Sequence, residues 1–416
     1  MFKTLHQIFN PKNKDLRKRI LFTLFGLFIF AVGTTITVPG TKGIISDLGF
    51  LELINVMSGG ALKKFSIFGL GVMPYISASI IVSLLQMDII PYFSELKEEG
   101  AAGRQKINKI TRYMGIIIAF IQGFAMAFAF GIKGNAWEYL RIATIMTGGT
   151  AFLLWLGDQM TQKGIGNGMS LIIMAGIINT IPQMFIDAFN SLVIDNSSLF
   201  VGIISFVVFI LVYLLIIVGI IWVEQSERRI PIQYANQTMA AYGNKQSYIP
   251  FKLDSSGVTP VIFASAVIAA PSFIANIIKN ENFTNFVNNY INYTSVTGFI
   301  LYILCILFFC YFYTFLQLSP DELSKNLSKN GGYIPGIRPG KETAKYIKTV
   351  LSRITLLGSL FLIIIAGMPI IFSNVSSLPT SVSIGGTGVL IIVGVALETY
   401  KQLESSLVNR NYKGGR

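Results

Sequence analysis

Residues 57–79 read MSGGALKKFSIFGLGVMPYISAS, an apolar stretch that four glycines, one proline and two adjacent lysines interrupt. Glycines in membrane helices often serve only close helix packing. Irregular backbone at membrane depth, however, is tolerated only where it is buried in protein or lines a watery cavity. We therefore expect residues 51–62 to form a small re-entrant helix in a cavity mouth. Residues 65–79 are then expected to enter the membrane as a true span, with Pro74 near its first turn.

The composition of the whole chain is that of an integral membrane protein. Its 416 residues are 52% hydrophobic and 13% charged, with a mean hydropathy of +0.62, whereas soluble domains carry about 25% charged residues. Residues 20–41 form an uncharged stretch that is too long for a signal peptide and lacks a small-residue cleavage site, so no cleavable signal is expected. His6 is the only histidine, and Cys305 and Cys310 lie in an apolar run as buried hydrophobes would. We expect no histidine-based metal site, disulfide or cofactor.

Ten apolar windows predict the membrane spans. About 20 apolar residues cross a hydrocarbon core of about 30 Å as a helix. The three shortest windows are expected to be buried among other helices. The windows are residues 20–38, 73–87, 113–132, 142–157, 166–186, 200–223, 257–278, 299–318, 354–372 and 385–397.

The basic residues assign the two sides of the membrane. With the N-terminus inside, 27 of the 33 lysines and arginines fall on its side and 6 fall on the other. The positive-inside rule therefore predicts that both termini are cytoplasmic.

The ten spans divide into five and five about a loop without basic residues. An odd number of spans in each half requires any internal repeat to be inverted across the membrane. The sequence shows no convincing internal identity, so the two inverted halves are an architectural inference. The predicted segments are a cytoplasmic N-terminal segment (1–19), an N-terminal half (20–186), an external hinge loop (187–195), a C-terminal half (196–403) and a cytoplasmic tail (404–416).

Two predicted cytoplasmic loops, residues 224–256 and 319–350, are large and basic. The first carries two adjacent arginines before a short β-like stretch, and glycines and prolines in the second force turns that present an arginine at a tip. Retention in the cytoplasm and attraction to anionic lipid would explain the charge alone. A structured tip is more than retention needs, so we expect a docking surface for a large partner. Its candidate residues are Arg228, Arg229, Arg338, Lys341 and Lys345.

The spans lack the residues that other membrane functions need. No window carries Asp, Glu, Lys, Arg or His in its core, which disfavours an ion-driven carrier, although a sodium site of backbone carbonyls and an inverted-repeat secondary transporter remain alternatives. The chain has no nucleotide-binding motif, so any work must come from a partner. Ser77, Ser79 and Ser170 have no base nearby in the sequence. We expect no enzyme activity.

Six motifs are spread over nearly the whole chain. They are SIFGLGVMPYISASIIVSLL (66–85), WLGDQMTQKGIGNGMSLII (155–173), ERRIPIQYA (227–235), GVTPVIFAS (257–265), GIRPG (336–340) and GGTG (385–388). In sequence and in order they resemble the motifs of the SecY family, the channel subunits of the bacterial protein-translocation machinery. The chain departs from the family at Ser83, Met169 and Thr259, where the family favours Gln, a β-branched residue and Ile. Methionine is flexible, so the seal at Met169 is expected to be looser.

The resemblance implies an all-α channel with an hourglass pore between the halves and a short plug helix on the external side. The second, third, seventh and eighth spans would border a lateral opening towards lipid. An apolar constriction dewets and blocks ions, yet it can deform around a peptide because aliphatic side chains make no directional bonds. By motif position the pore ring is Val72, Ile76, Met169, Ile173, Ile262 and Ile391. The plug is Leu51, Leu53, Ile54, Met57, Ser58, Gly59, Gly60 and Leu62.

The implied function is the central channel of the Sec translocon in the bacterial plasma membrane. It would pass unfolded secretory polypeptides and release transmembrane segments sideways into lipid. The implied partners are the SecA ATPase or the ribosome at the docking loops, SecE clamping the halves, and a peripheral SecG. A signal peptide of about 7–15 apolar residues would wedge between helices and favour the open state. An accessory SecY paralogue with restricted substrates is the remaining alternative within the family.

Overall fold

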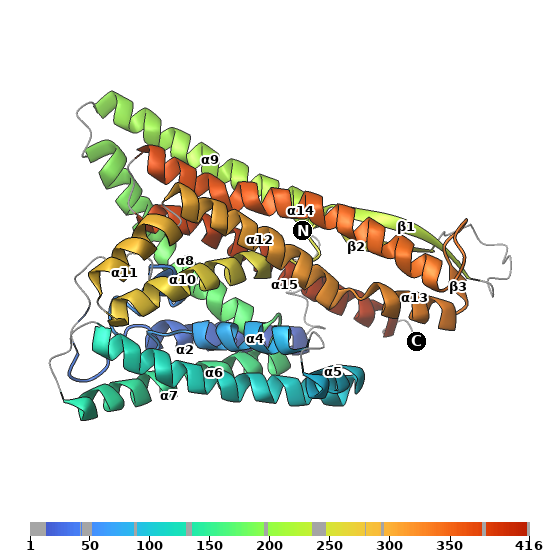
Figure 1. The fold of residues 1–416 in the computed structure, drawn as a ribbon, viewed down its shortest axis with the longest axis horizontal. Helices are drawn as coiled ribbons and strands as arrows, with labels where there is room; N and C mark the ends of the chain where they lie inside the picture. The colour runs from blue at the N-terminus through green and yellow to red at the C-terminus, as the bar shows by residue number, and fades with distance from the viewer. Residues whose placement is uncertain are drawn as a thin grey trace.

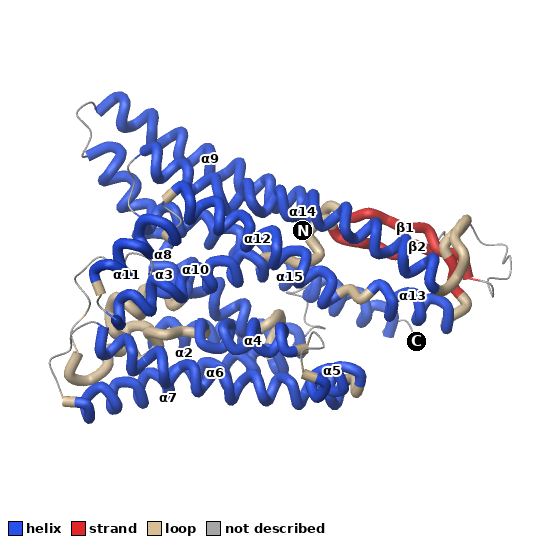
Figure 2. The backbone as a smooth tube through the Cα atoms, viewed as in Figure 1, coloured by secondary structure: helices blue, strands red, loops and turns tan. Residues whose placement is uncertain are grey.

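The computed structural model describes residues 14–41, 43, 52–86, 90–129, 135–194, 199–234, 247–278, 280–292, 295–376 and 380–413. Most of these residues are helical, and one small sheet lies at one end of the molecule (Figure 2). Ten helices coincide with the predicted spans: α2 (Lys14–Gly33), α4 (Met73–Leu85), α6 (Ala101–Ala129), α7 (Ala136–Lys163), α8 (Gly168–Phe189), α9 (Leu199–Gln225), α10 (Thr259–Ile278), α12 (Val296–Gln317), α14 (Lys341–Ser376) and α15 (Thr380–Lys413). Shorter elements are α3 (Glu52–Met57), α5 (Pro91–Glu98), α11 (Glu281–Phe286), α13 (Pro320–Lys329) and the π-helical turns η3 (Asn190–Ile194) and η4 (Val287–Ile291).

The outer faces of these helices are apolar. Within the described residues, α6, α7, α8, α9, α12 and α14 are long and apolar enough to cross a membrane, and α4 and α10 are shorter apolar helices. In α9 only 22% of the most apolar window is buried, and Leu211, Leu215 and Val218 are exposed. Contiguous apolar surface of this kind is stable only against lipid or another protein. The chain is therefore a multi-pass membrane protein, as its composition predicts.

Helix boundaries depart from the apolar windows at several places. α6 and α14 begin well before the windows at 113 and 354, because the lysines, arginines, alanines and glutamates there are good helix formers. The span expected at 65–79 becomes helical only at Met73, since the residues before it form turns and Gly71 has a φ of +55°. Residues 190–194 of the expected hinge loop are π-helical.

The helices form two groups, and α2, α4, α6 and α7 lie below α9, α12 and α14 in the view of Figure 1. The two groups meet along two seams. α2, α4, α6, α7 and α8 pack together, and so do α9, α10, α12, α14 and α15. The first seam is extensive and runs between α8 and α15, with η3 packed on both α8 and α9. The second, which we call the α10 seam, is a smaller contact of α10 with α4 and α6. The two groups are thus held tightly on one side and weakly on the other.

The turn between α7 and α8 makes hydrogen bonds to α2 and to α15 at one end of the α8–α15 seam. The turn between α7 and α8 donates from the Ile165 backbone N–H to Thr23 Oγ1 on α2, at 3.0 Å. Its Gly166 N–H donates to Gln402 Oε1 on α15, at 2.8 Å, from a left-handed backbone with φ of +84°. At the other end of α8 the chain continues through η3 towards α9. The Gly166 bond therefore crosses the seam at one end, and η3 packs on both helix groups at the other.

The sheet combines the two large basic loops of the sequence. β1 (Glu227–Tyr234) pairs antiparallel with β2 (Ser247–Lys252) and with β3 (Gly332–Tyr333), in the order β2-β1-β3. The β-like stretch expected after the paired arginines is thus confirmed. Ile230 and Ile232 alternate inward and pack with Phe251, Ile347 and Leu351 in a small core against α14. That core gives the basic end of the molecule a fixed shape.

Candidate functional site

Residues 52–62 of the predicted plug, which we call the plug segment, form α3 and a compact turn seated on α8. α3 packs against α8 and α15. Asn55 organises the turn that follows, because its Oδ1 accepts from the Lys63 backbone N–H at 2.9 Å and its carbonyl accepts from the Gly60 N–H at 2.8 Å. Asn179 Nδ2 on α8 donates to the Gly59 carbonyl at 2.8 Å. The segment is thus held by its own hydrogen bonds, and the Asn179 side chain ties it to α8.

The structure describes most of the predicted plug residues. Ile54, Met57, Ser58 and Leu62 are buried. Gly59 and Gly60 have φ of +75° and +78°, so they end the helix at Met57 and turn the chain. The helix therefore covers less of residues 51–62 than expected. Leu51 and the side chain of Leu53 lie outside the described residues.

All six predicted ring residues belong to one apolar cluster. Val72, Ile76, Ile173 and Ile391 are buried, and Met169 and Ile262 are partly buried against the same cluster. Val72 caps α4 and Ile76 follows in its first turn, so both come from the segment that Pro74 and the preceding glycines shape. The residues come from α4, α8, α10 and α15, which belong to both helix groups. The cluster also contains many residues outside the ring.

Met169 has a packing partner that the sequence did not indicate. A Cβ on Gly157 of α7 would lie 2.6 Å from Met169 Sδ. The thioether therefore fills the space above a glycine on α7. This contact is consistent with a methionine at a position where the family favours a β-branched residue, because a flexible methionine can fill an irregular gap.

An ion pair between α6 and α7 was not predicted. Arg112 on α6 pairs with Asp158 on α7 at 2.5 Å. The phenol of Tyr75 on α4 lies within electrostatic range of both, and of Tyr313 on α12. Arg112 and Asp158 each stand one position outside a predicted apolar window, so the windows excluded them. Opposite charges at matching ends of consecutive antiparallel windows were the signal that could have found the pair.

The basic residues of β1 are exposed and partly anchored. Arg229 Nη2 lies 2.7 Å from Glu227 Oε1, and its guanidinium lies over the Tyr248 ring, 4.8 Å from the centroid. Its neighbour Arg228 is exposed. The predicted tip is confirmed as a turn between β3 and α14, where Arg338 is exposed between Gly336 at φ +80° and Gly340 at φ +97°. The Arg338 carbonyl accepts from Thr343 Oγ1 at 2.9 Å, which fixes the turn to α14.

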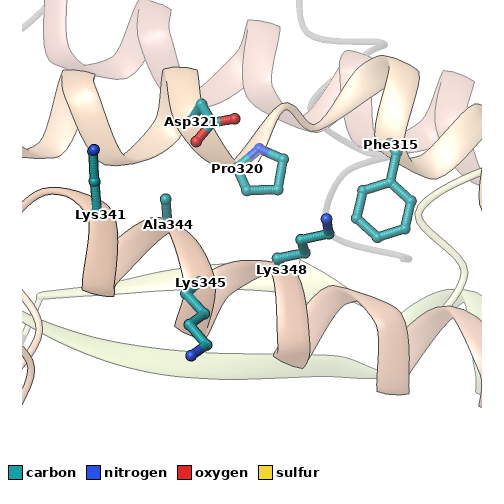
Figure 3. A pocket seen from close by; sticks show the side chains of 7 residues that line it. All are labelled: Phe315, Pro320, Asp321, Lys341, Ala344, Lys345 and Lys348. Carbon is teal, nitrogen blue, oxygen red and sulfur yellow. The ribbon is translucent and has the colours of Figure 1, made fainter.

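A groove of about 540 Å³ opens beside this tip. Figure 3 shows its lining, with Lys348 extending towards Phe315, and with Pro320 and Asp321 on the wall across from α14. Lys341, Lys345 and Lys348 follow at helical spacing on α14, so they share one face. Lys348 was not among the predicted residues. The groove lining is Phe315, Pro320, Asp321, Lys341, Ala344, Lys345 and Lys348.

Comparisons with known proteins agree on one family. The family profile described as SecY matches residues 66–400. The chain is 43% identical to "Protein translocase subunit SecY" of Bacillus subtilis (strain 168) over 429 residues, which cover 100% of this chain and 99% of the relative. It is 44% identical to the protein of the same name from Staphylococcus carnosus (strain TM300) over 428 residues, with the same coverage.

Solved structures share the fold at lower identity. A structure described as "The structure of a protein conducting channel" matches with a TM-score of 0.69 and 19% identity, covering 94% of this chain and 93% of that one. "Sec61 in the Canine ribosome-channel complex from the endoplasmic reticulum" matches with a TM-score of 0.66, 19% identity and the same coverage.

Proposed function

The chain belongs to the SecY family, and from that premise we propose how its parts act in protein translocation. Its full-length relatives are translocase subunits, so its function is that of a protein-conducting channel. An inverted-repeat secondary transporter is not favoured, since relatives of that kind are not what the chain matches over its full length. The proposal assigns the apolar cluster, the plug segment, the α10 seam and the basic end to steps of one process.

The observation that carries the proposal is the gathering of ring residues from both helix groups in one apolar cluster. Branched aliphatic side chains at a constriction exclude water and therefore ions. They make no directional bonds, so an extended polypeptide can displace them without breaking any. We assign this role to Val72, Ile76, Met169, Ile173, Ile262 and Ile391.

The plug segment is proposed to complete the seal. It is internally held by Asn55, so it can leave as a unit, and the Asn179 hydrogen bond to Gly59 together with close packing on Gly176 seats it on α8. The α10 seam is proposed to be the lateral opening, because it is the smaller of the two contacts between the groups. A transmembrane segment that parts α10 from α4 and α6 would reach lipid there.

The basic end is proposed to face the cytoplasm and to receive the partner that supplies the work. Arg228, Arg229, Arg338, Lys341 and Lys345 are exposed there. Under this proposal both termini are cytoplasmic and the membrane is the bacterial plasma membrane. The SecA ATPase or the ribosome would dock on the sheet and tip, SecE would clamp the two groups, and SecG would be peripheral. A related Ssh1 complex is described as bound to the yeast 80S ribosome, which supports a ribosome as one such partner.

Site-specific crosslinking of an arrested secretory chain tests the path. Photo-reactive or cysteine crosslinkers at Ile76 and Ile262 are expected to capture the chain. A matched crosslinker at Leu215, exposed on the outer face of α9, is expected to capture lipid and no secretory chain. Equal capture of the secretory chain at all three positions, or its capture at Leu215 alone, would refute a path through the centre of the protein.

A further inference from the structure

A buried carboxyl joins the sheet to α10. Asp254 lies between β2 and α10 and is only 5% exposed. Its Oδ1 accepts from Ser256 Oγ at 3.1 Å and from the Gly257 backbone N–H at 2.9 Å. Gly257 is left-handed, with φ of +61°, and α10 starts two residues later. Residues 253–258, which we call the Asp254 turn, therefore set where α10 begins.

The Asp254 turn is clamped by three other helices. The Leu253 N–H donates to the Ser226 carbonyl, just after α9, at 2.9 Å. A Cβ on Gly358 of α14 would lie 2.5 Å from the Leu253 carbonyl oxygen. A Cβ on Gly394 of α15 would lie 2.7 Å from Val258 Cγ2. Close packing on these sides leaves little room for water around the carboxyl.

The groups that face Asp254 come from several elements. Burial raises the pKa of the Asp254 carboxyl to about 7; Glu224 on α9 adds to the rise, and Ser256, Gly257 and Lys252 oppose it. The Cys310 thiol of α12 lies beside Asp254 and Ser256. On α15, Glu398 and Lys401 act on Glu224, and Lys401 Nζ lies 3.5 Å from the Glu224 carbonyl oxygen. An ionised Asp254 would thus stand in a dry site beside a second acid.

We propose that Asp254 is a positioning residue whose protonation sets the placement of α10 against α4 and α6. With a neutral carboxyl the Asp254 turn stays closed. With a carboxylate the turn must admit water or move away from Glu224, and the start of α10 moves with it. Because α10 forms the α10 seam, the seam then depends on pH. The consequence for transport rests on the proposed lateral opening, whereas the movement of α10 does not.

Pulsed electron paramagnetic resonance on the full chain with its partner subunits in lipid nanodiscs tests this inference. Nitroxide labels are introduced as a non-canonical amino acid at Ile81 of α4 and Val267 of α10, which are 40% and 43% exposed. This labelling leaves Cys305 and Cys310 unmodified. The distance distribution is expected to shift with a midpoint near pH 7. Asp254→Asn is expected to hold it constant, and Glu398→Gln is expected to retain the shift.

Three results would contradict the role of Asp254. No shift in the unsubstituted protein, an unchanged shift in Asp254→Asn, or loss of the shift in Glu398→Gln overturns the proposal. Ser256→Ala provides a second, milder variant that removes one hydrogen bond to the carboxylate. Its midpoint is expected to move to higher pH, and an unmoved midpoint also contradicts the role of Asp254. Failure to release transmembrane segments into lipid despite a normal pH shift would refute the lateral opening and leave Asp254 standing.

Discussion

Gly176 on α8 is the position at which one methyl group should unseat the plug segment. A Cβ on Gly176 would lie 2.3 Å from the Met57 carbonyl oxygen and 3.1 Å from the Gly59 backbone nitrogen. Both neighbours are backbone atoms, so neither can swing aside as a flexible side chain would. Gly176→Ala must therefore push the plug segment away from α8.

The expected shift in the plug equilibrium depends on whether the seated or the unseated state bears the steric cost of the methyl group. Inserting a methyl group into a packed site costs about 1–3 kcal/mol. Alanine favours a helix over glycine by about 1 kcal/mol, but α8 is expected to stay helical whether the plug is seated or not, so this gain cancels. The steric cost falls on the seated state alone. At about 1.4 kcal/mol for each factor of ten, the unseated population should rise about 5-fold to about 150-fold.

Ion conductance of the purified channel complex in planar bilayers measures that population. Gly148→Ala on α7 is the matched control, because nothing lies within 4 Å of its added Cβ. Asn179→Ala loses the hydrogen bond to Gly59, which is typically about 0.5–1.5 kcal/mol, so it should leak less than Gly176→Ala. Deletion of residues 51–62 should give the highest ion conductance of these variants. If Gly176→Ala conducts no more than Gly148→Ala at equal protein, the seating of the plug on α8 is refuted.

Three further substitutions test the basic end, the ion pair and the buried acid. Arg338→Glu should impair motor-driven translocation into vesicles without lowering thermal stability, because the side chain is exposed; an equal loss in Lys325→Glu on α13 would contradict a specific role. Asp158→Ala should lower the free energy of unfolding by on the order of 1 kcal/mol, since its pair with Arg112 is only partly buried. The charge-swapped double variant should regain part of the loss in a denaturant titration, and no recovery would contradict the pairing. Folding raises the pKa of Asp254 from 3.8 to about 7, so its contribution to stability is present below about pH 4 and declines by about 4 kcal/mol as the pH rises to about 7. Asp254→Asn should abolish that decline in unfolding titrations across this range, and an unchanged decline would refute the burial of a titrating carboxyl.

The helices and their membrane character could be predicted because bilayer thickness demands long apolar runs. Their ends could not, because charge limits an apolar window but does not end a helix. The charged starts of α6 and α14 are helical for that reason. The start of α4 is a different case. The sequence shows the glycines and Pro74, but only the structure shows that the residues before Met73 form turns and not a helix.

The candidate site was predictable where a motif or a cluster of charge marked it. The ring positions came from family motifs, and the structure places them in one cluster, although their role in the pore stays a prediction. β3 has only two residues and no periodic signal, so its pairing with β1, which joins the two basic loops, was out of reach. Lys348 could be recognised as part of the groove only once α14 was known to extend through it. The burial of Asp254 depends on glycines of α14 and α15 that are far away in the chain.

The two seams are unequal: the helix groups are joined more extensively along α8 and α15 than where α10 meets α4 and α6. The hydrogen bond from the Gly166 N–H to Gln402 crosses the larger seam at one end, and η3 packs on both α8 and α9 at the other. Under the proposed lateral opening, the two groups part where α10 meets α4 and α6. A transmembrane segment leaving sideways would then always depart at the α10 seam, and a partner subunit resting along α8 and α15 would not block its exit.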